Sequence, residues 1–179
     1  MTPQDMEARI VRYGALKPCK TAFIDAHTPG SDQKENFTII GGGVSQFTTT
    51  LYNAVFWGGY QDVDHKPHSY YFSRYPMGIE ATLDYVSVPL VWRNNDTEGA
   101  YVNTYYTDTS ITVEMYSTKY WEVEQTGQAA WRSGACRSVE TFRSRTNPDG
   151  EVLEDSVSAR YRPGEGLDCN GNPTPKPRG

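Results

Sequence analysis

Long apolar runs are missing from this sequence of 179 residues. No stretch approaches the roughly 20 consecutive apolar residues that a membrane-spanning helix needs. The first turns of the chain also lack the apolar segment of a signal peptide, so no export signal is predicted within it. We therefore expect a chain that does not span a membrane.

Positive charge is also scarce. The chain has 17 lysine and arginine residues against 22 aspartate and glutamate residues, which gives a net charge of −5, and it contains no basic run. Proteins that bind nucleic acids generally carry clustered positive charge, which neutralises phosphates. Nucleic acid is therefore not an expected partner.

Cysteine is limited to Cys19, Cys136 and Cys169, and no two of them are spaced as in a metal knuckle. A bond between Cys136 and Cys169 would close a loop of about 33 residues and stabilise the chain by roughly 3–4 kcal/mol. The residues alone leave this disulfide and separate thiols equally open.

Metal ligands are sparse as well. Their densest group is the short run that contains Asp62, Asp64, His65 and His68. Such a run without a further ligand cluster is typical of a solvated turn. No metal site and no cofactor are predicted.

Aromatic residues, in contrast, are abundant: they make up 13% of the chain and include 13 tyrosines. This content and the length predict one domain with a sizeable core. Exposed tyrosines could also form a surface on which sugars stack, although tyrosines on strands more often stabilise the sheet. The candidates for such a surface are Tyr70, Tyr71, Tyr75, Tyr101, Tyr105 and Tyr106.

A helix is predicted over residues 45–58, directly after the glycine run Gly41, Gly42 and Gly43. Apolar residues recur there with the spacing of one helix face, and Ser45 stands where an N-cap residue would. Gly58 and Gly59 predict the end of the helix.

The rest of the chain predicts an α+β fold, in which this helix packs on a mostly antiparallel sheet that is followed by a C-terminal hairpin. The predicted strands are Tyr70–Tyr75, Ala81–Tyr85, Pro89–Arg93, Tyr101–Thr107, Ser110–Ser117, Tyr120–Gln125, Ser138–Thr146 and Val152–Tyr161. The predicted divisions are a short N-terminal helix and loop (1–40), a core (41–125), a hairpin extension (126–169) and a disordered proline-rich tail (170–179).

One constellation could carry chemistry. Ser45 at a helix start, followed by His68 and then by Asn94 or Asn95, has the chain order of papain-like and transglutaminase-like enzymes. In this reading Ser45 is the nucleophile, His68 is the base, and an asparagine orients the imidazole. The alternative, which the residue chemistry favours, is that Ser45 only caps the helix, because a serine hydroxyl is not activated by the helix dipole alone.

Several motifs resemble the VanW family, which is named for an accessory protein of vancomycin-resistance clusters. They occur in order over Gly41–Lys119, and they read GGGVSQFTTTLYN (41–53), KPHS (66–69), SRYPMGIEAT (73–82), RNNDT (93–97) and YTDTSITVEMYSTK (106–119). Many members have cysteine at the position of Ser45 and aspartate at that of Glu80. Residues 136–169 are similar to the tail of actinobacterial-type members.

The resemblance implies a cell-envelope context, because full-length relatives are generally extracytoplasmic and carry export or membrane segments. This chain would then be a truncated form that lacks them. An oxidising compartment implies a disulfide between Cys136 and Cys169. The function implied is a non-catalytic module that binds peptidoglycan or its precursors; the alternative is the hydrolase or acyl-transferase with Ser45 and His68. The binding groove would include Gly41, Gly42, Gly43, Gln46, Tyr70 and Arg74.

Overall fold

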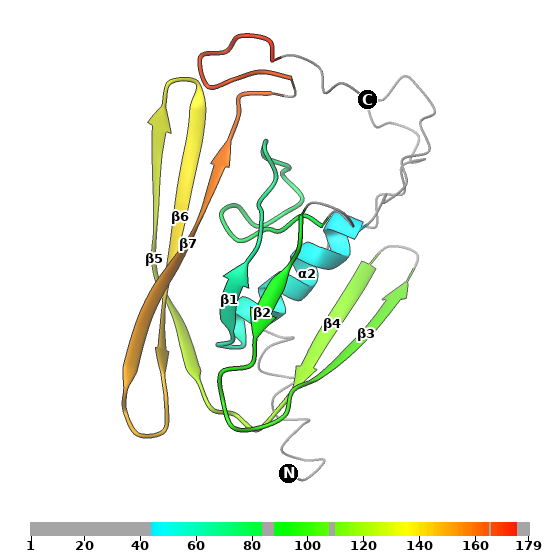
Figure 1. The fold of residues 1–179 in the computed structure, drawn as a ribbon, viewed down its shortest axis with the longest axis vertical. Coiled ribbons are helices and arrows are strands. Elements are labelled where there is room, and N and C mark those ends of the chain that lie inside the picture. The colour runs from blue at the N-terminus through cyan, green and yellow to red at the C-terminus, as the bar shows by residue number, and fades with distance from the viewer. Residues whose placement is uncertain (1–43, 84–87, 108–109, 165, 175–179) are drawn as a thin grey trace.

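A computed structural model describes residues 44–83, 88–107, 110–164 and 166–174. The expected N-terminal helix, the three glycines before residue 44 and Cys19 lie outside the described residues. Helix α2 (Val44–Trp57) occupies the centre of the molecule, and three small antiparallel sheets surround it (Figure 1). The fold is α+β, as the sequence predicts.

Two buried threonines of helix α2 form side-chain hydrogen bonds with the backbone of the helix itself. The Thr48 and Thr50 hydroxyls donate to the carbonyls of Val44 and Gln46, four residues earlier. This local bond allows a threonine to sit inside a packed helix without an unpaired hydroxyl. Because α2 begins at Val44, Ser45 lies inside the first turn rather than at the expected N-cap position.

The end of α2 follows from Gly59. This residue has a φ of +83°, and its amide donates to Phe56 while the Tyr60 amide donates to Val55. Both bonds define a Schellman motif, which requires a left-handed residue that glycine adopts without strain. A Cβ atom at Gly59 would lie only 2.5 Å from the side chain of Trp121.

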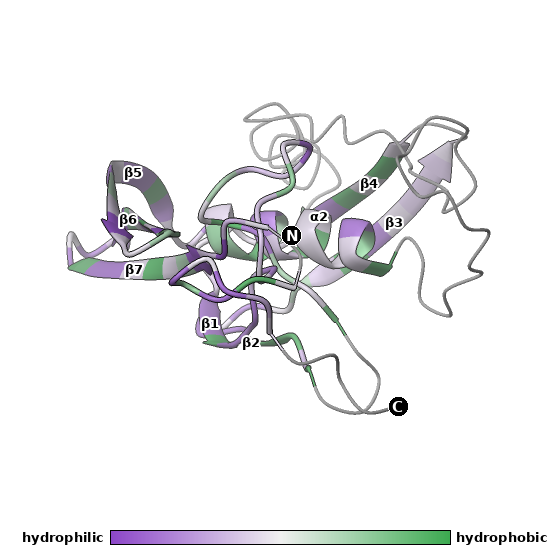
Figure 2. Ribbon diagram, turned by 90° about the horizontal axis from the view of Figure 1, so that it is seen from above, coloured by the Kyte–Doolittle hydropathy of each residue, from purple (hydrophilic) through white to green (hydrophobic). Residues whose placement is uncertain are grey.

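The strands form three sheets rather than one. Strands β1 (Gln61–Asp64) and β2 (Val91–Arg93) pair, as do β3 (Tyr101–Thr107) and β4 (Ser110–Tyr116). The third sheet has the order β5–β6–β7, with bounds Glu122–Ser133, Cys136–Thr146 and Val152–Tyr161. Viewed from above, α2 lies between this sheet and the β3–β4 hairpin (Figure 2).

Two predicted strands differ from the structure. Within the described residues, 70–75 and 81–83 contribute only isolated bridges, Tyr70 to Arg162 and Thr82 to Lys66. The β-rich composition of these segments reflects side-chain packing in loops instead. The expected C-terminal hairpin is the β6–β7 part of a larger sheet, since β5 continues to Ser133.

The core forms on two sides of α2. Tyr52 and Phe56 pack with Ile79, Ala81 and Val157, the last of which belongs to β7. The opposite side packs mainly against the β3–β4 hairpin: Val55, Tyr60 and Met115 are its buried residues. Within the described ranges, no helix has the length and hydropathy that crossing a bilayer requires.

The segment after β7 is tied back to the third sheet. A disulfide joins Cys136 and Cys169, and the Ala135 amide donates to the Cys169 carbonyl at 2.6 Å. The sequence predicts a disordered tail from residue 170, but residues 170–174 form a hydrogen-bonded turn around Asp168. The Asp168 carboxylate accepts the amides of Asn170 and Asn172.

Candidate functional site

His68 lies in a segment that neighbouring segments hold from two sides. On one side the Thr82 amide donates to the Lys66 carbonyl at 2.7 Å. On the other side the Arg162 amide, just after β7, donates to the Ser69 carbonyl at 2.8 Å. These two bonds fix the backbone around His68 on a surface where the β1 segment meets the end of β7.

The imidazole of His68 pairs with Glu80. Its Nδ1 atom lies 2.8 Å from Glu80 Oε2, and the Glu80 side chain is fully buried while that of His68 is 11% exposed. A carboxylate can only accept a hydrogen bond, so Nδ1 carries the proton whenever Glu80 is ionised. The pair therefore leaves Nε2 as the basic nitrogen of the ring.

Aromatic side chains fix the plane of the His68 ring. Tyr75 stacks on it with a centroid distance of 4.9 Å, and Phe72 meets it edge-on at 5.0 Å. The Arg74 guanidinium lies over Phe72 and Tyr75, at 4.8 and 5.2 Å from their centroids. Burial raises the pKa of Tyr75 although Arg74 acts in the opposite direction.

Tyr161 of β7 lies against the same carboxylate. Its hydroxyl accepts a hydrogen bond from the Gly78 amide at 2.9 Å. Burial, together with the nearby Glu80 carboxylate, raises the pKa of Tyr161. Glu80 therefore connects residues from the loop segment and from the third sheet.

Helix α2 supports the backbone on either side of Glu80. The Thr49 hydroxyl donates to the Ala81 carbonyl at 2.9 Å, and the Asn53 amide donates to the Ile79 carbonyl at 2.8 Å. Both side chains are buried. The carboxylate thus sits on a segment that the central helix positions.

The expected nucleophile lies further along this helix face. Ser45 and Thr49 are four residues apart and therefore share a face of α2. Thr49 is the residue bonded beside Glu80, so Ser45 follows one turn, about 5.4 Å, closer to the N-terminus. Gln46, next to Ser45, is 2% exposed. Thr49 therefore contacts the segment that carries Glu80, and the role of Ser45, one turn away on the same face, stays a prediction.

The two asparagines have different surroundings, and only Asn94 makes hydrogen bonds within a turn. Asn94 donates to the Glu98 carbonyl at 2.6 Å and accepts the Asp96 amide at 3.3 Å. The Oδ1 atom of Asn95 is buried without a hydrogen-bond partner among the described residues. The group that bonds to Nδ1 of His68 is Glu80, a carboxylate from a distant segment.

The expected binding residues divide into two sets. Tyr70 and Arg74 lie in the loop that carries His68, with the Tyr70 ring 4.6 Å from Phe72. Gly41, Gly42 and Gly43 lie outside the described residues. Among the described residues, no three His, Cys, Asp or Glu side chains gather in a metal-binding arrangement.

A second histidine has a similar partner. His65 Nδ1 lies 2.6 Å from Asp62 Oδ2, which also accepts the Tyr52 hydroxyl at 2.9 Å. The His65 and Tyr52 rings stack at 4.2 Å. Burial and the Asp62 carboxylate raise the pKa of Tyr52.

A network of tyrosines covers the outer face of the β3–β4 hairpin. Tyr105 and Tyr116 donate to the two carboxylate oxygens of Glu114, and Asn103 donates to the same group. Partial burial opposes ionisation of Glu114, but the bonds from Tyr116, Asn103 and Tyr105 outweigh it and lower its pKa. Tyr101, which pairs with Tyr116 across the strands, is 64% exposed.

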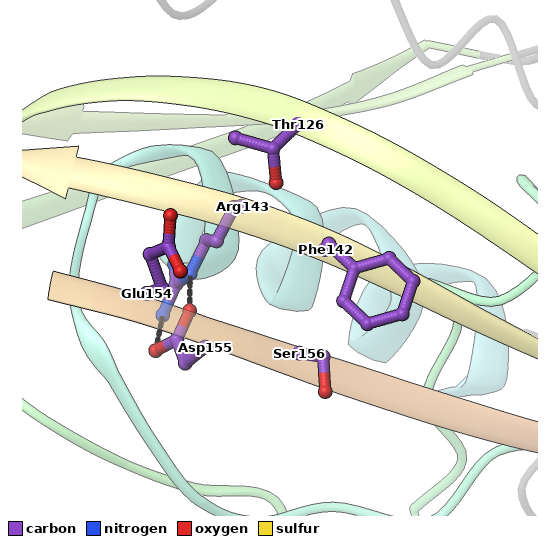
Figure 3. A pocket seen from close by; sticks show the side chains of 6 residues that line it. All are labelled: Thr126, Phe142, Arg143, Glu154, Asp155 and Ser156. Atoms are coloured by element: carbon purple, nitrogen blue, oxygen red, sulfur yellow. Dashed lines mark hydrogen bonds and ion pairs between the residues drawn. The ribbon is translucent and has the colours of Figure 1, made fainter.

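A small cavity of about 280 Å³ lies on the third sheet (Figure 3). It borders Arg143, whose guanidinium bonds to both oxygens of Asp155 and to the carbonyls of Phe56 and Tyr60. Burial opposes the ionisation of Asp155, but the two neighbouring arginines lower its pKa. Four of the five N–H donors of Arg143 are thus engaged within the chain, and we assign it a structural role at the end of α2.

Sequence reasoning missed Glu80 and Tyr161. One signal for Glu80 was present: it is a single acidic residue between Ile79 and Ala81, a context that favours burial. Tyr161 carried no such signal, because its contact with the Glu80 segment joins residues about 80 positions apart.

The family model described as VanW like protein matches residues 21–116, more than half of the chain. The match contains α2 and strands β1 to β4 and ends at Tyr116, the last residue of β4. The corresponding searches of curated proteins and of solved structures found no match.

Proposed function

Because the chain belongs to the VanW-like family, we propose that it is a cell-envelope module that binds peptidoglycan or a precursor of it. The observation that carries this proposal is the outer face of the β3–β4 hairpin. Three tyrosines and a carboxylate form an ordered, partly exposed surface there, and no described core element covers it. Binding at this face involves no catalytic step.

The chemistry of the face suits a glycan. The apolar face of a sugar ring packs against an aromatic ring, while its hydroxyl and amide groups need donors and acceptors nearby. Tyr101 and Tyr105 are 64% and 49% exposed and provide such rings. Glu114 holds the Tyr105 and Tyr116 hydroxyls in place, so less side-chain entropy is lost when a ligand binds.

The disulfide supports an extracytoplasmic location. Bonds of this kind form and persist in oxidising compartments such as the bacterial envelope. Cys136 is fully buried, and its bond to Cys169 closes a 33-residue separation. The proposed location of the module is therefore the outer side of the cytoplasmic membrane.

Retention on purified cell-wall sacculi tests the binding function. Tyr101→Ala and Tyr105→Ala should each weaken retention about 3- to 10-fold, since an aromatic contact contributes roughly 0.5–1.5 kcal/mol. Tyr106→Ala is the matched control: Tyr106 is 81% exposed on the same strand but faces the other side. Equal losses in all three variants, or retention no better than that of an unrelated acidic protein, would contradict the proposal.

A second candidate function rests on the His68–Glu80 pair. A histidine whose Nδ1 is held by a buried carboxylate can accept a proton at Nε2, as a hydrolase or an acyl-transferase requires. Turnover of soluble muropeptides by the wild type, His68→Ala and Ser45→Ala would test it. Loss of activity in both variants would support Ser45 as the nucleophile; loss in His68→Ala alone would support a bound water. No turnover by the wild type would leave binding as the function.

A further inference from the structure

Four arginines gather at one end of the β5–β6–β7 sheet, although the chain as a whole is acidic. This arginine end consists of Arg132, Arg137, Arg160 and Arg162. Strand β5 ends there, β6 begins there and β7 ends there, next to the segment that the disulfide ties back (Figure 1). Three adjacent strands thus each carry an arginine at the same end, and their backbones lie within about 10 Å given a strand spacing of about 4.8 Å.

The arginine end is not balanced by its surroundings. All four side chains are exposed, and no hydrogen bond or ion pair joins their guanidinium groups to another described residue. Arg132 and Arg137 stand directly opposite each other across β5 and β6. Like charges in this arrangement destabilise a sheet, so the arrangement does not serve the stability of the fold.

The acidic groups nearby are engaged elsewhere. Glu140 on β6 accepts the Ser156 hydroxyl at 2.6 Å. The Asp168 carboxylate accepts backbone amides of its own turn, and these bonds lower its pKa. Neither carboxylate forms an ion pair with a guanidinium of the arginine end among the described residues, so these guanidinium groups are not held by a partner within the chain.

The backbone beneath the arginines is held firmly. The disulfide links Cys136, the residue before Arg137, to Cys169. The amide of Arg162 donates to Ser69, and Tyr70 bridges to Arg162. The backbone that carries the arginines is thus already ordered before a ligand binds, which reduces the entropy lost on binding.

We propose that the arginine end is a binding site for a linear polyanion, a polymer of phosphate-linked units. A guanidinium group presents a planar fork of donors that matches a phosphate. Arg132 and Arg137 lie on the side of the sheet that carries Tyr161, whereas Arg160 lies on the side of Trp131. A chain can pass around the end of the sheet and reach both sides; a single phosphate or a flat membrane cannot.

Trp131 adds a second element on that side. It is 47% exposed and lies in one cross-strand row with Ser138 and Arg160. An exposed aromatic ring beside a cation can pack against the apolar part of a polymer unit. The arginine end is separate from the tyrosine face of β3–β4, so this proposal does not depend on glycan binding there.

The salt dependence of binding to inorganic polyphosphate tests the proposal on the full chain. For a flexible polyanion, each neutralised charge contributes about 0.7 to the slope of log K against log salt concentration. Arg132→Gln with Arg137→Gln should lower this slope by about 1.4 and weaken binding at least tenfold at 0.1 M salt. Arg93→Gln on β2, an exposed arginine outside the arginine end, should change the affinity by less than about twofold.

Thermal unfolding separates this role from a structural one. Because the two arginines repel each other, the melting temperature of each single variant should stay equal or rise. A clear fall would mean that the pair is structural and would overturn the proposal. Equal salt slopes in all variants would overturn it too.

Three other ligands identify the occupant. Orthophosphate that competes as well as polyphosphate at equal phosphate concentration would show a site for one phosphate. Stronger binding to phosphatidylglycerol vesicles than to polyphosphate would show a membrane surface, and stronger binding to oligothymidylate than to polyphosphate would show recognition of bases. Each of these results would overturn the polymer proposal, whereas weak binding to orthophosphate and to vesicles, with oligothymidylate bound no more strongly than polyphosphate, supports it.

Discussion

The molecule contains two histidine–carboxylate pairs that look alike and are held in different ways. His65 and His68 both bond through Nδ1, and both side chains are 11% exposed. Asp62 belongs to the same segment as His65, three residues away, and is 17% exposed. Glu80 is twelve residues from His68 and fully buried.

This difference shows that pair geometry alone does not define a site. Asp62 and His65 are three residues apart, so the local backbone brings them together, and the pair would persist through small changes in packing. The Glu80 pair depends on α2 and β7, because Thr49, Asn53 and Tyr161 position the segment around the carboxylate. Tyr52 of α2 also contacts the Asp62 pair, but only the Glu80 pair lies against both α2 and β7 and therefore depends on the assembly of more of the molecule.

Removal of each histidine should give the largest difference in stability between the two pairs. His68→Ala leaves the buried Glu80 carboxylate without its hydrogen-bonding partner, which we expect to cost about 3 kcal/mol of unfolding free energy. His65→Ala leaves Asp62 bonded to Tyr52, so we expect about 1 kcal/mol. Urea denaturation measures both values.

A double variant controls this first prediction. Replacing Glu80 with glutamine removes the buried charge, so His68→Ala should cost less in the Glu80→Gln background than in the wild type. Equal costs in the two backgrounds would show that the pair does not interact.

At alkaline pH, the tyrosine beside each pair should make the free energy of unfolding depend on pH. The pKa values of Tyr52 and Tyr161 are raised by burial and by Asp62 and Glu80, respectively. A raised pKa means that the full stability is present below about pH 10, where unfolded tyrosine ionises, and is lost as the pH rises. Unfolding free energy should therefore fall above about pH 10 by up to 1.4 kcal/mol per pH unit for each tyrosine.

Tyr52→Phe and Tyr161→Phe test this at two pH values. Each should cost about 1 kcal/mol at pH 7, where a hydrogen bond is lost, and each should flatten the decline above about pH 10. A decline as steep as that of the wild type would assign the alkaline loss to other groups.

Thr49 of α2 supports the segment that carries Glu80 through hydrogen bonds to Ala81. Thr49→Val keeps the shape of the side chain but removes its bonds to Ala81, at an expected cost of about 1 kcal/mol. The matched control is Thr48→Val, whose hydroxyl bonds only within the helix. Nitrogen NMR of the imidazoles should show a shift for His68 in Thr49→Val and none for His65. Shifts of both rings would contradict the separation of the two pairs.

Local patterns explain how much of the fold could be predicted. The apolar periodicity and the following glycines placed α2 within one residue at each end. Turn residues placed β3 and β4, and the Asn147–Gly150 turn placed the β6–β7 connection. These signals act over a few residues, so they are visible without the tertiary structure.

The candidate site depends on contacts that no local pattern encodes. His68 was a candidate because histidine carries acid–base chemistry, but its partner Glu80 is set by a loop that packs on α2. Residues 70–75 have the composition of a strand, yet Phe72 and Tyr75 surround an imidazole instead. Catalysis by Ser45 stays a prediction.

The arginines at the end of α2 have a consequence for dissecting this protein. Arg143 and Arg145 of β6 bond to the Phe56 carbonyl in the last turn of the helix and to the Gly59 and Tyr60 carbonyls just after it. Val157 completes one core cluster, and all three of these β-strand residues follow the segment that defines the family. The segment that matches the family model is therefore smaller than the unit that folds: a fragment cut at Tyr116 would lose the arginines that bond to the end of its helix, and a usable minimal protein must extend through β7.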